Sequence, residues 1–257
     1  MPNSRYPWRV FWVLLAAAIF GVFALLPYVL VLFERVAKNA AGVETSSTLF
    51  VVMQVLHLTL IFGAAIALGL LVVGRVGLQL PLLRRWLEGD ATEVRAGAVR
   101  VALIAGIAVG VYTVLALYGF VIPRIPQWPS EAAMPWWTRV LICFYGAINE
   151  ELLMRLFVLG LLLWIVKKIT RSEAPLRGAS FWFANVAAAV IYGAAYLPAA
   201  ASVAHLTSFA IVAIVLLKAV AGVVFGDLFR RFGLETVMLA HFVSDILIHV
   251  VGPLLAR

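Results

Sequence analysis

The chain alternates long apolar runs with short polar connections. The longer runs reach about 20 residues, the length with which a helix crosses a hydrocarbon core of about 30 Å. A helix satisfies its backbone hydrogen bonds internally, as lipid requires. The pattern predicts an all-α, polytopic membrane helix bundle, one transmembrane domain over residues 1–257. Its roughly seven spans are expected near residues 10–33, 48–74, 100–122, 140–166, 181–198, 207–229 and 234–255.

Two connections carry patterns of their own. The stretch "PRIPQWPSEAAMPWWTR", residues 123–139, combines prolines that break helices with tryptophans that suit the headgroup region. An eighth, re-entrant or interfacial segment here is the alternative to a plain loop. The longest polar connection lies between the second and third runs. We expect a short amphipathic cytoplasmic helix around residues 82–87, with a solvated loop as the alternative.

Composition supports a membrane protein and excludes other classes. Hydrophobic residues make up 65% of the chain and charged residues 12%, whereas about a quarter of a soluble domain is charged. The net charge of +8 does not indicate nucleic acid, because the basic residues flank apolar runs and suit anionic lipid headgroups. The single cysteine, Cys143, excludes a disulfide framework within this chain.

The basic residues also predict an orientation. If the N-terminus is cytoplasmic, 13 of the 20 Lys and Arg residues flank spans on the cytoplasmic side and 5 on the other. Positive charge concentrates on the cytoplasmic side of membrane proteins. We therefore expect a multi-pass protein of a bacterial-type plasma membrane with its N-terminus in the cytoplasm.

Charged residues inside the fourth run require an explanation. Glu150, Glu151 and Arg155 lie in "AINEELLMRL", although one charge at the bilayer centre costs at least about 2.5–3.5 kcal/mol. Glu151 and Arg155 are four residues apart, share a helix face and can pair. Their pair alone is equally compatible with a structural salt bridge. Glu150 points about 100° away and needs a partner from another span, or must bind a proton, water or a metal.

The last run offers partners for Glu150. In "MLAHFVSDILIHVVG", His241 and Asp245 share a face that must point into the bundle. Together with Glu150 they suit general-base activation of water or a metal site of imidazole and carboxylate ligands. His241 alone would be read as a core histidine, and His249 as solvated or structural. Lys218 is either a counter-ion for the acidic cluster or a snorkelling side chain.

These residues resemble the CPBP family of intramembrane proteases, also called the Abi or CAAX-processing family. "EELLMR" matches its E-E-x-x-x-R motif, and "HFVSD" matches its H-x-x-x-N/D motif. The resemblance covers roughly residues 140–250, which we take as the catalytic core. In residues 1–139, which hold the N-terminal spans and the cytoplasmic loop, the resemblance is limited to the presence of apolar spans.

This chain departs from the middle motif of the family. The family carries F-x-x-x-H, whereas "IYGAAYLPAA" places Tyr192 at the Phe position and Tyr196 at the His position. A neutral phenol is a poor metal ligand but a competent hydrogen-bond donor to an oxyanion. The substitution disfavours a zinc site, which would use Glu150, His241 and Asp245. We therefore expect no cofactor.

The resemblance implies an intramembrane endopeptidase. In this hypothesis Glu150 activates water, and Arg155 orients Glu151 or binds a substrate carboxylate; the residues expected to be catalytic are Glu150, Glu151, Tyr196, His241 and Asp245. The expected partners are membrane lipids and a membrane-associated or lipidated peptide or protein. One alternative is a relative that binds such a partner without cutting it, as the departure at Tyr196 suggests. The other is a small proton-linked transporter that uses Glu150, Asp245 and Lys218 as a relay, but the chain lacks the internal repeat typical of transporters.

Overall fold

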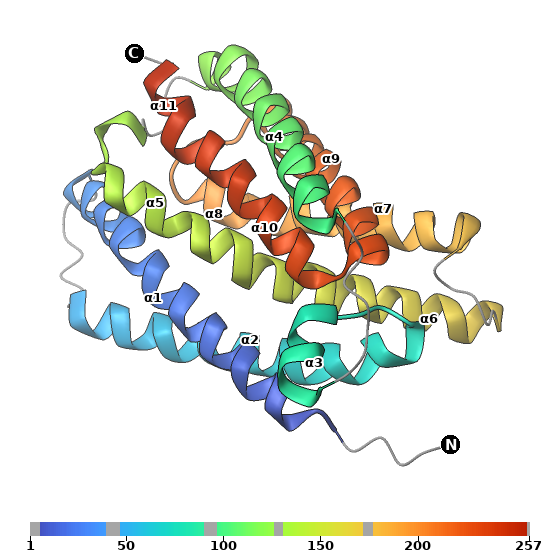
Figure 1. Cartoon of the computed structure of the whole chain (residues 1–257). Coiled ribbons are helices and arrows are strands. Elements are labelled where there is room, and N and C mark those ends of the chain that lie inside the picture. Colours follow the sequence, from blue (N-terminus) through green and yellow to red (C-terminus); the bar gives the residue numbers. More distant parts are fainter. Residues whose placement is uncertain (1–5, 40–46, 90–96, 126–130, 172–176, 256–257) are drawn as a thin grey trace.

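The computed structural model describes residues 6–39, 47–89, 97–125, 131–171 and 177–255. Within these ranges the regular structure is helical, with no strand. The longer helices are α1 (Trp8–Asn39), α2 (Ser47–Val76), α4 (Ala98–Ala116), α5 (Trp136–Tyr145), α6 (Gly160–Thr170), α7 (Gly178–Ala195), α9 (Ser208–Phe232) and α10 (Leu234–Asp245). The shorter helices are α3 (Pro81–Glu88), α8 (Leu197–Ala201) and α11 (Gly252–Leu255). The predicted polytopic helical bundle is thereby confirmed (Figure 1).

Six helical segments are long and apolar enough to cross a membrane. In the described part of the chain they are Trp8–Val31, Thr48–Val76, Ala98–Arg124, Gly178–Ala201, Ser208–Phe232 and Leu234–Leu255. Their outward faces carry exposed large apolar side chains such as Leu60, Leu115 and Phe183, which suits contact with lipid rather than water. The chain is an integral membrane protein. The cytoplasmic position of the N-terminus and the division of the chain into residues 1–139 and a catalytic core stay predictions.

The run predicted at 140–166 lies within a longer helical segment, residues 136–170, which we call the central helix. It comprises α5, the π-helical segments η4 (Gly146–Glu150) and η5 (Leu152–Leu159), and α6. The π-helical segments lie on either side of Glu151, so the charged motif occupies widened turns. Isolated π-helical turns are often found at functional sites. The charges within this segment set it apart from the six apolar spans.

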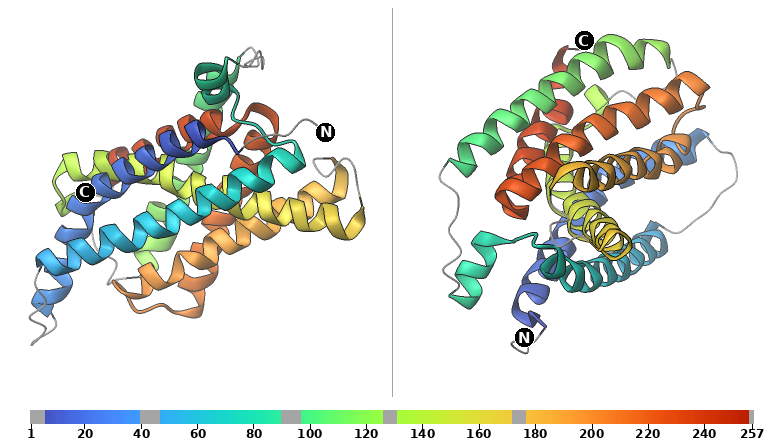
Figure 2. Two further views of the ribbon diagram at one scale, coloured as in Figure 1. Left: turned by 90° about the horizontal axis from the view of Figure 1, so that it is seen from below. Right: turned by 90° about the vertical axis from the view of Figure 1, so that its right-hand side faces the viewer.

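The other helices surround the central helix. Along its length it contacts α1, α2, α7 and α10, while α4 packs on α10 and α9 packs on α7. Figure 2 (right) shows the yellow end of the central helix nearly end-on, with these helices around it. Two further spans also change helix type. The third continues from α4 through η1 (Leu117–Val121) and η2 (Ile122–Arg124), and the last continues from α10 through η6 (Ile246–Val251) into α11.

Small residues allow the closest helix contacts. A Cβ on Gly222 of α9 would lie 2.8 Å from the Cβ of Ala189 in α7, and one on Gly226 would overlap the Asn185 amide. Asn185 Nδ2 donates a hydrogen bond to the Val223 carbonyl at 2.9 Å. The two glycines therefore allow α9 to pack closely against α7.

The predicted short helix near residues 82–87 is also present, as α3. Pro81 occupies its first turn, where a missing N–H costs nothing. The Leu83 N–H donates to Glu235 Oε1 at 2.9 Å, so the first turn of α10 also caps α3. In the segment 123–139, residues 126–130 lie outside the described part. Of its described residues, 123–124 belong to η2, Glu131–Ala133 form the short 3-10 helix η3, and 136–139 begin α5.

Candidate active site

The two adjacent glutamates occupy different environments. Glu151 is fully buried. Its Oε1 lies 2.5 Å from His241 Nδ1, and its Oε2 lies 3.1 Å from Arg155 Nε. The predicted pairing with Arg155 is confirmed, and the pair joins the central helix to α10. A carboxylate only accepts hydrogen bonds, so Nδ1 of the imidazole carries a proton and Nε2 is turned toward the cluster.

Glu150 faces a partly open environment, with its side chain 16% exposed. It accepts a hydrogen bond from the Tyr192 hydroxyl. Lys218 Nζ lies 3.9 Å from Glu150 Oε2 and donates to the Tyr192 hydroxyl at 3.2 Å. Lys218 is therefore a counter-ion of Glu150, one of its two predicted roles. The partner that Glu150 lacks on its own span is supplied by α7 and α9.

His241 lies between the carboxylates of three residues. Its Nε2 is 3.8 Å from Glu150 Oε2 and 3.4 Å from Asp245 Oδ1. The predicted meeting of Glu150 with the face of the last span is confirmed. Sequence spacing grouped His241 with Glu150 and Asp245, but the carboxylate nearest to His241 belongs to Glu151. Phe225 packs against the imidazole, with ring centroids 5.0 Å apart.

Gly146 brings the central helix against Asp245. A Cβ at this position would overlap Asp245 Oδ2 and lie 3.4 Å from His241 Nε2. Only glycine allows this approach one turn before Glu150. Sequence reasoning missed Gly146, although a glycine one turn before the glutamate pair was a usable signal.

The two tyrosines of the altered motif contact the cluster differently. Tyr192, the residue at the family's Phe position, is buried and bonds Glu150. Tyr196 presents its ring to Lys218, whose Nζ lies 4.0 Å from the ring centroid, and is near enough to Glu150 and Asp245 to interact electrostatically. The sequence did not predict that Tyr192 contacts Glu150 directly. The role expected of Tyr196 stays a prediction.

Arg155 is buried rather than open to a ligand. Its guanidinium lies 5.1 Å from the Tyr192 ring centroid and 5.4 Å from that of Phe225, and its Nη atoms have no hydrogen-bond partner. A cavity of about 10 Å³ beside it has room for a single water. This placement supports the first of the two predicted roles, orientation of Glu151.

A second polar cluster lies beyond Asp245 on the last span. His249 Nδ1 is 3.0 Å from Glu131 Oε2, and the Tyr28 hydroxyl donates to Glu131 Oε1 at 2.8 Å. Burial by itself raises the pKa of Glu131, but His249, Tyr28 and Arg139 together hold that pKa below its ordinary value. His249 is therefore part of a partly buried pair that fixes η3 to α1 and η6. No local pattern in the sequence indicates this pairing.

The donor atoms do not form a zinc site. In the described part of the chain, no three His, Cys, Asp or Glu side chains are arranged to hold a metal ion. The Lys218 ammonium already lies 3.9 Å from Glu150 Oε2, the oxygen that a metal would need. The residues that would bind zinc, Glu150, His241 and Asp245, therefore do not fit it. The expectation of a reaction without a cofactor stays a prediction.

Comparison with known proteins gives one family. Residues 132–247 match the family model described as type II CAAX prenyl endopeptidase Rce1-like. No curated protein matches the chain, and no solved structure matches it. The match contains the glutamate motif, both tyrosines, Lys218 and His241 with Asp245, and it supports a membrane peptidase in general terms. The predicted resemblance to the CPBP family of intramembrane proteases is therefore confirmed over residues 132–247.

Proposed function

We propose that this protein is an intramembrane endopeptidase that hydrolyses a peptide bond of a membrane-associated or lipidated protein, with Glu150 as the general base. The observation that carries the proposal is the position of Glu150 Oε2, 3.8 Å from His241 Nε2. This separation allows one water to lie about 2.8 Å from both atoms. Such a water lies within reach of both a base and a hydrogen-bond donor.

Glu151 and Arg155 hold His241 in place for this reaction. With Nδ1 bound to Glu151, a protonated imidazole directs its Nε2–H toward Glu150 and Asp245. Three acidic side chains, Glu150, Glu151 and Asp245, are thus matched in number by three basic ones, Arg155, Lys218 and His241. Balance matters because an uncompensated charge inside a membrane is costly. Glu151 and Arg155 are thus positioning residues.

The chemical steps use residues already in the cluster. Glu150 takes a proton from the water, and the resulting hydroxide attacks the carbonyl carbon to form a C–O bond. His241, Lys218 and the Tyr196 hydroxyl stabilise the oxyanion. The intermediate collapses by breaking the C–N bond, and Glu150 gives its proton to the leaving amine. The products are a new carboxyl terminus and a free amine. Lys218 supplies positive charge near the position of the absent histidine.

A binding protein without peptidase activity is the second candidate. The Glu150 carboxylate already accepts a hydrogen bond from Tyr192 and lies beside Lys218. It therefore does not require a bound water as a further partner. This observation favours capture of a lipidated partner without cleavage. Kinetics of matched variants separate the two functions.

The test uses the full chain purified in detergent, with a fluorogenic farnesylated CAAX peptide and its unprenylated counterpart as probes. We expect the parent to cleave the farnesylated peptide, and Glu150→Gln to lose at least about 100-fold in kcat, the lower end for general-base catalysis. Equal cleavage by Glu150→Gln and parent contradicts Glu150 as the base. Binding of the peptide by both proteins without cleavage supports the second candidate. His57→Gln, which changes a histidine of α2, is the matched control and retains activity.

A further inference from the structure

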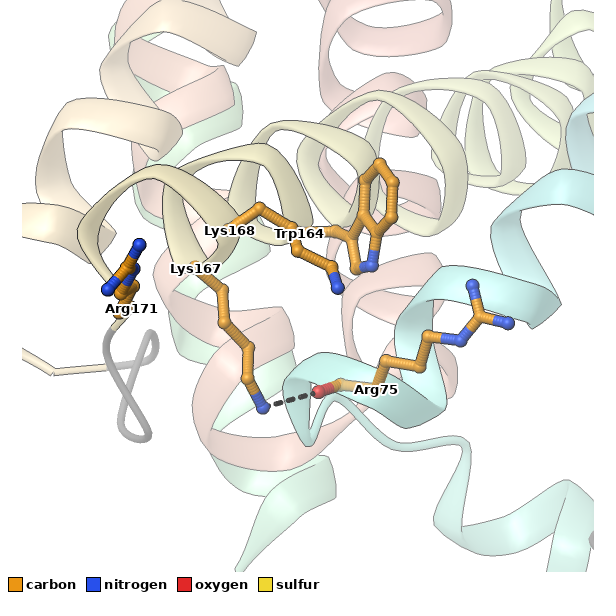
Figure 3. A pocket seen from close by; sticks show the side chains of 5 residues that line it. All are labelled: Arg75, Trp164, Lys167, Lys168 and Arg171. Atoms are coloured by element: carbon orange, nitrogen blue, oxygen red, sulfur yellow. Dashed lines mark hydrogen bonds between the residues drawn. The ribbon is translucent and has the colours of Figure 1, made fainter.

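A basic pocket lies at the ends of α2 and α6, away from the glutamate cluster. It has a volume of about 390 Å³ and is lined by Arg75, Trp164, Lys167, Lys168 and Arg171. Figure 3 shows Lys167 and Lys168 extending from α6 into the space next to the last turn of α2, where Arg75 lies. Four positively charged side chains therefore line one hollow, with Arg75 and Arg171 on opposite sides of the view.

The preference for basic residues at helix C-termini accounts for only some of these positive charges. Both α2 and α6 end here, and basic residues in a last turn offset the partial negative charge of the carbonyl groups. Lys167 Nζ donates to the Arg75 carbonyl at 3.1 Å and so ties the two ends together. That contact occupies one ammonium, whereas the side chains of Arg75, Lys168 and Arg171 add like charges to the same pocket. Like charges repel, and an anion in the pocket relieves the repulsion.

The surroundings of the pocket suit a lipid more than a soluble anion. Trp164 lines the pocket, and indole rings are enriched at the level of lipid headgroups. On α2, Leu71 and Leu68 lie one and two turns before Arg75, and 43% and 48% of their surfaces are exposed. A ligand with its headgroup at Arg75 would meet an apolar strip directly below, deeper in the bilayer.

We propose that this pocket binds the phosphate group of an anionic phospholipid, with the acyl chains lying along Leu71 and Leu68. Arg75 and Arg171 can offer paired N–H donors to phosphate oxygens, while Lys168 acts as a point charge beside Trp164, 5.9 Å from its ring centroid. Basic pockets between spans bind anionic headgroups in this manner. The proposal is independent of the peptidase activity.

The test measures lipid binding by the full chain in detergent, using native mass spectrometry with added phosphatidylglycerol or phosphatidylcholine. We expect phosphatidylglycerol to bind at least tenfold more tightly than phosphatidylcholine. The double variant Arg75→Gln with Lys168→Gln should weaken phosphatidylglycerol binding on the order of 30-fold, because each basic residue near an anionic surface contributes about 1 kcal/mol. Both side chains are exposed, so the variant is expected to fold. Lys168→Arg, which keeps the charge, should bind like the parent.

The control variant Arg84→Gln with Arg85→Gln removes the same charge from α3, outside the pocket. It should retain phosphatidylglycerol binding. Equal loss in the control and in the pocket variant overturns the proposal, because binding would then follow net charge alone. Displacement of phosphatidylglycerol by an equal concentration of inorganic phosphate overturns it in favour of a soluble phosphate ligand. Unchanged binding in the pocket variant overturns it as well.

Discussion

The adjacent glutamates offer a direct test of the cluster, because the structure gives them different tasks. Glu151 is fully buried between Arg155 and His241, whereas Glu150 is 16% exposed and faces Lys218, which is 26% exposed. The change Glu→Gln removes one charge at either position and keeps the size of the side chain. We predict that Glu151→Gln destabilises the protein strongly and Glu150→Gln only weakly, although both lose activity.

The magnitude follows from burial. Removal of one partner from a buried ion pair costs about 3–5 kcal/mol, because the other charge stays buried and unpaired. In Glu151→Gln that charge is Arg155, which is 2% exposed and whose Nη atoms have no other partner. In Glu150→Gln, Lys218 can turn toward water or headgroups. A more exposed pair contributes about 0–1 kcal/mol.

Thermal unfolding of the purified variants in detergent measures the difference. For a domain of this size, about 3–5 kcal/mol corresponds to a decrease in Tm of roughly 6–20 °C. The double variant Glu151→Leu with Arg155→Leu should recover part of the loss, since a buried pair replaced by apolar residues is often neutral. An unchanged Tm in Glu151→Gln, or an equal decrease in Glu150→Gln, would refute the reasoning.

Three further predictions concern neighbouring features. Gly146→Ala should lower the free energy of unfolding by about 1–3 kcal/mol, because the new Cβ would overlap Asp245. Gly74→Ala is the control and should leave this free energy unchanged, because its Cβ meets no atom within 4 Å. Unfolding of both variants in detergent measures the difference. The contacts that lower the pKa of Glu131 contribute stability that is present above the ordinary carboxyl pKa of about 4.3 and is lost as the pH falls through the lower folded-state value. Glu131→Gln should lose that dependence, and equal Tm profiles of parent and variant below about pH 4.3 would contradict it. Tyr196→Phe keeps the ring that Lys218 contacts but removes the hydroxyl, so kcat should fall by about 10²–10³ at unchanged Tm; an unchanged kcat would remove Tyr196 from the mechanism.

The sequence determined the membrane bundle and most members of the cluster. Apolar runs of spanning length have few folded states in lipid other than helices. Charges inside such runs must point inward, so Glu150, Glu151, Arg155, His241 and Asp245 could be identified from spacing and motif alone. The short helix α3 followed from local pattern in the same way.

Only the tertiary structure decided which of these residues touch. Spacing places a side chain on a face of its own helix, but the depth and rotation of one helix against another depend on packing along the whole contact. This is why Glu151 rather than Glu150 lies nearest to His241, and why Tyr192 donates to Glu150. It is also why Glu131 and His249, 118 positions apart, form a pair. Contacts between distant segments leave no periodic trace in the sequence, because each partner is ordinary in its own segment.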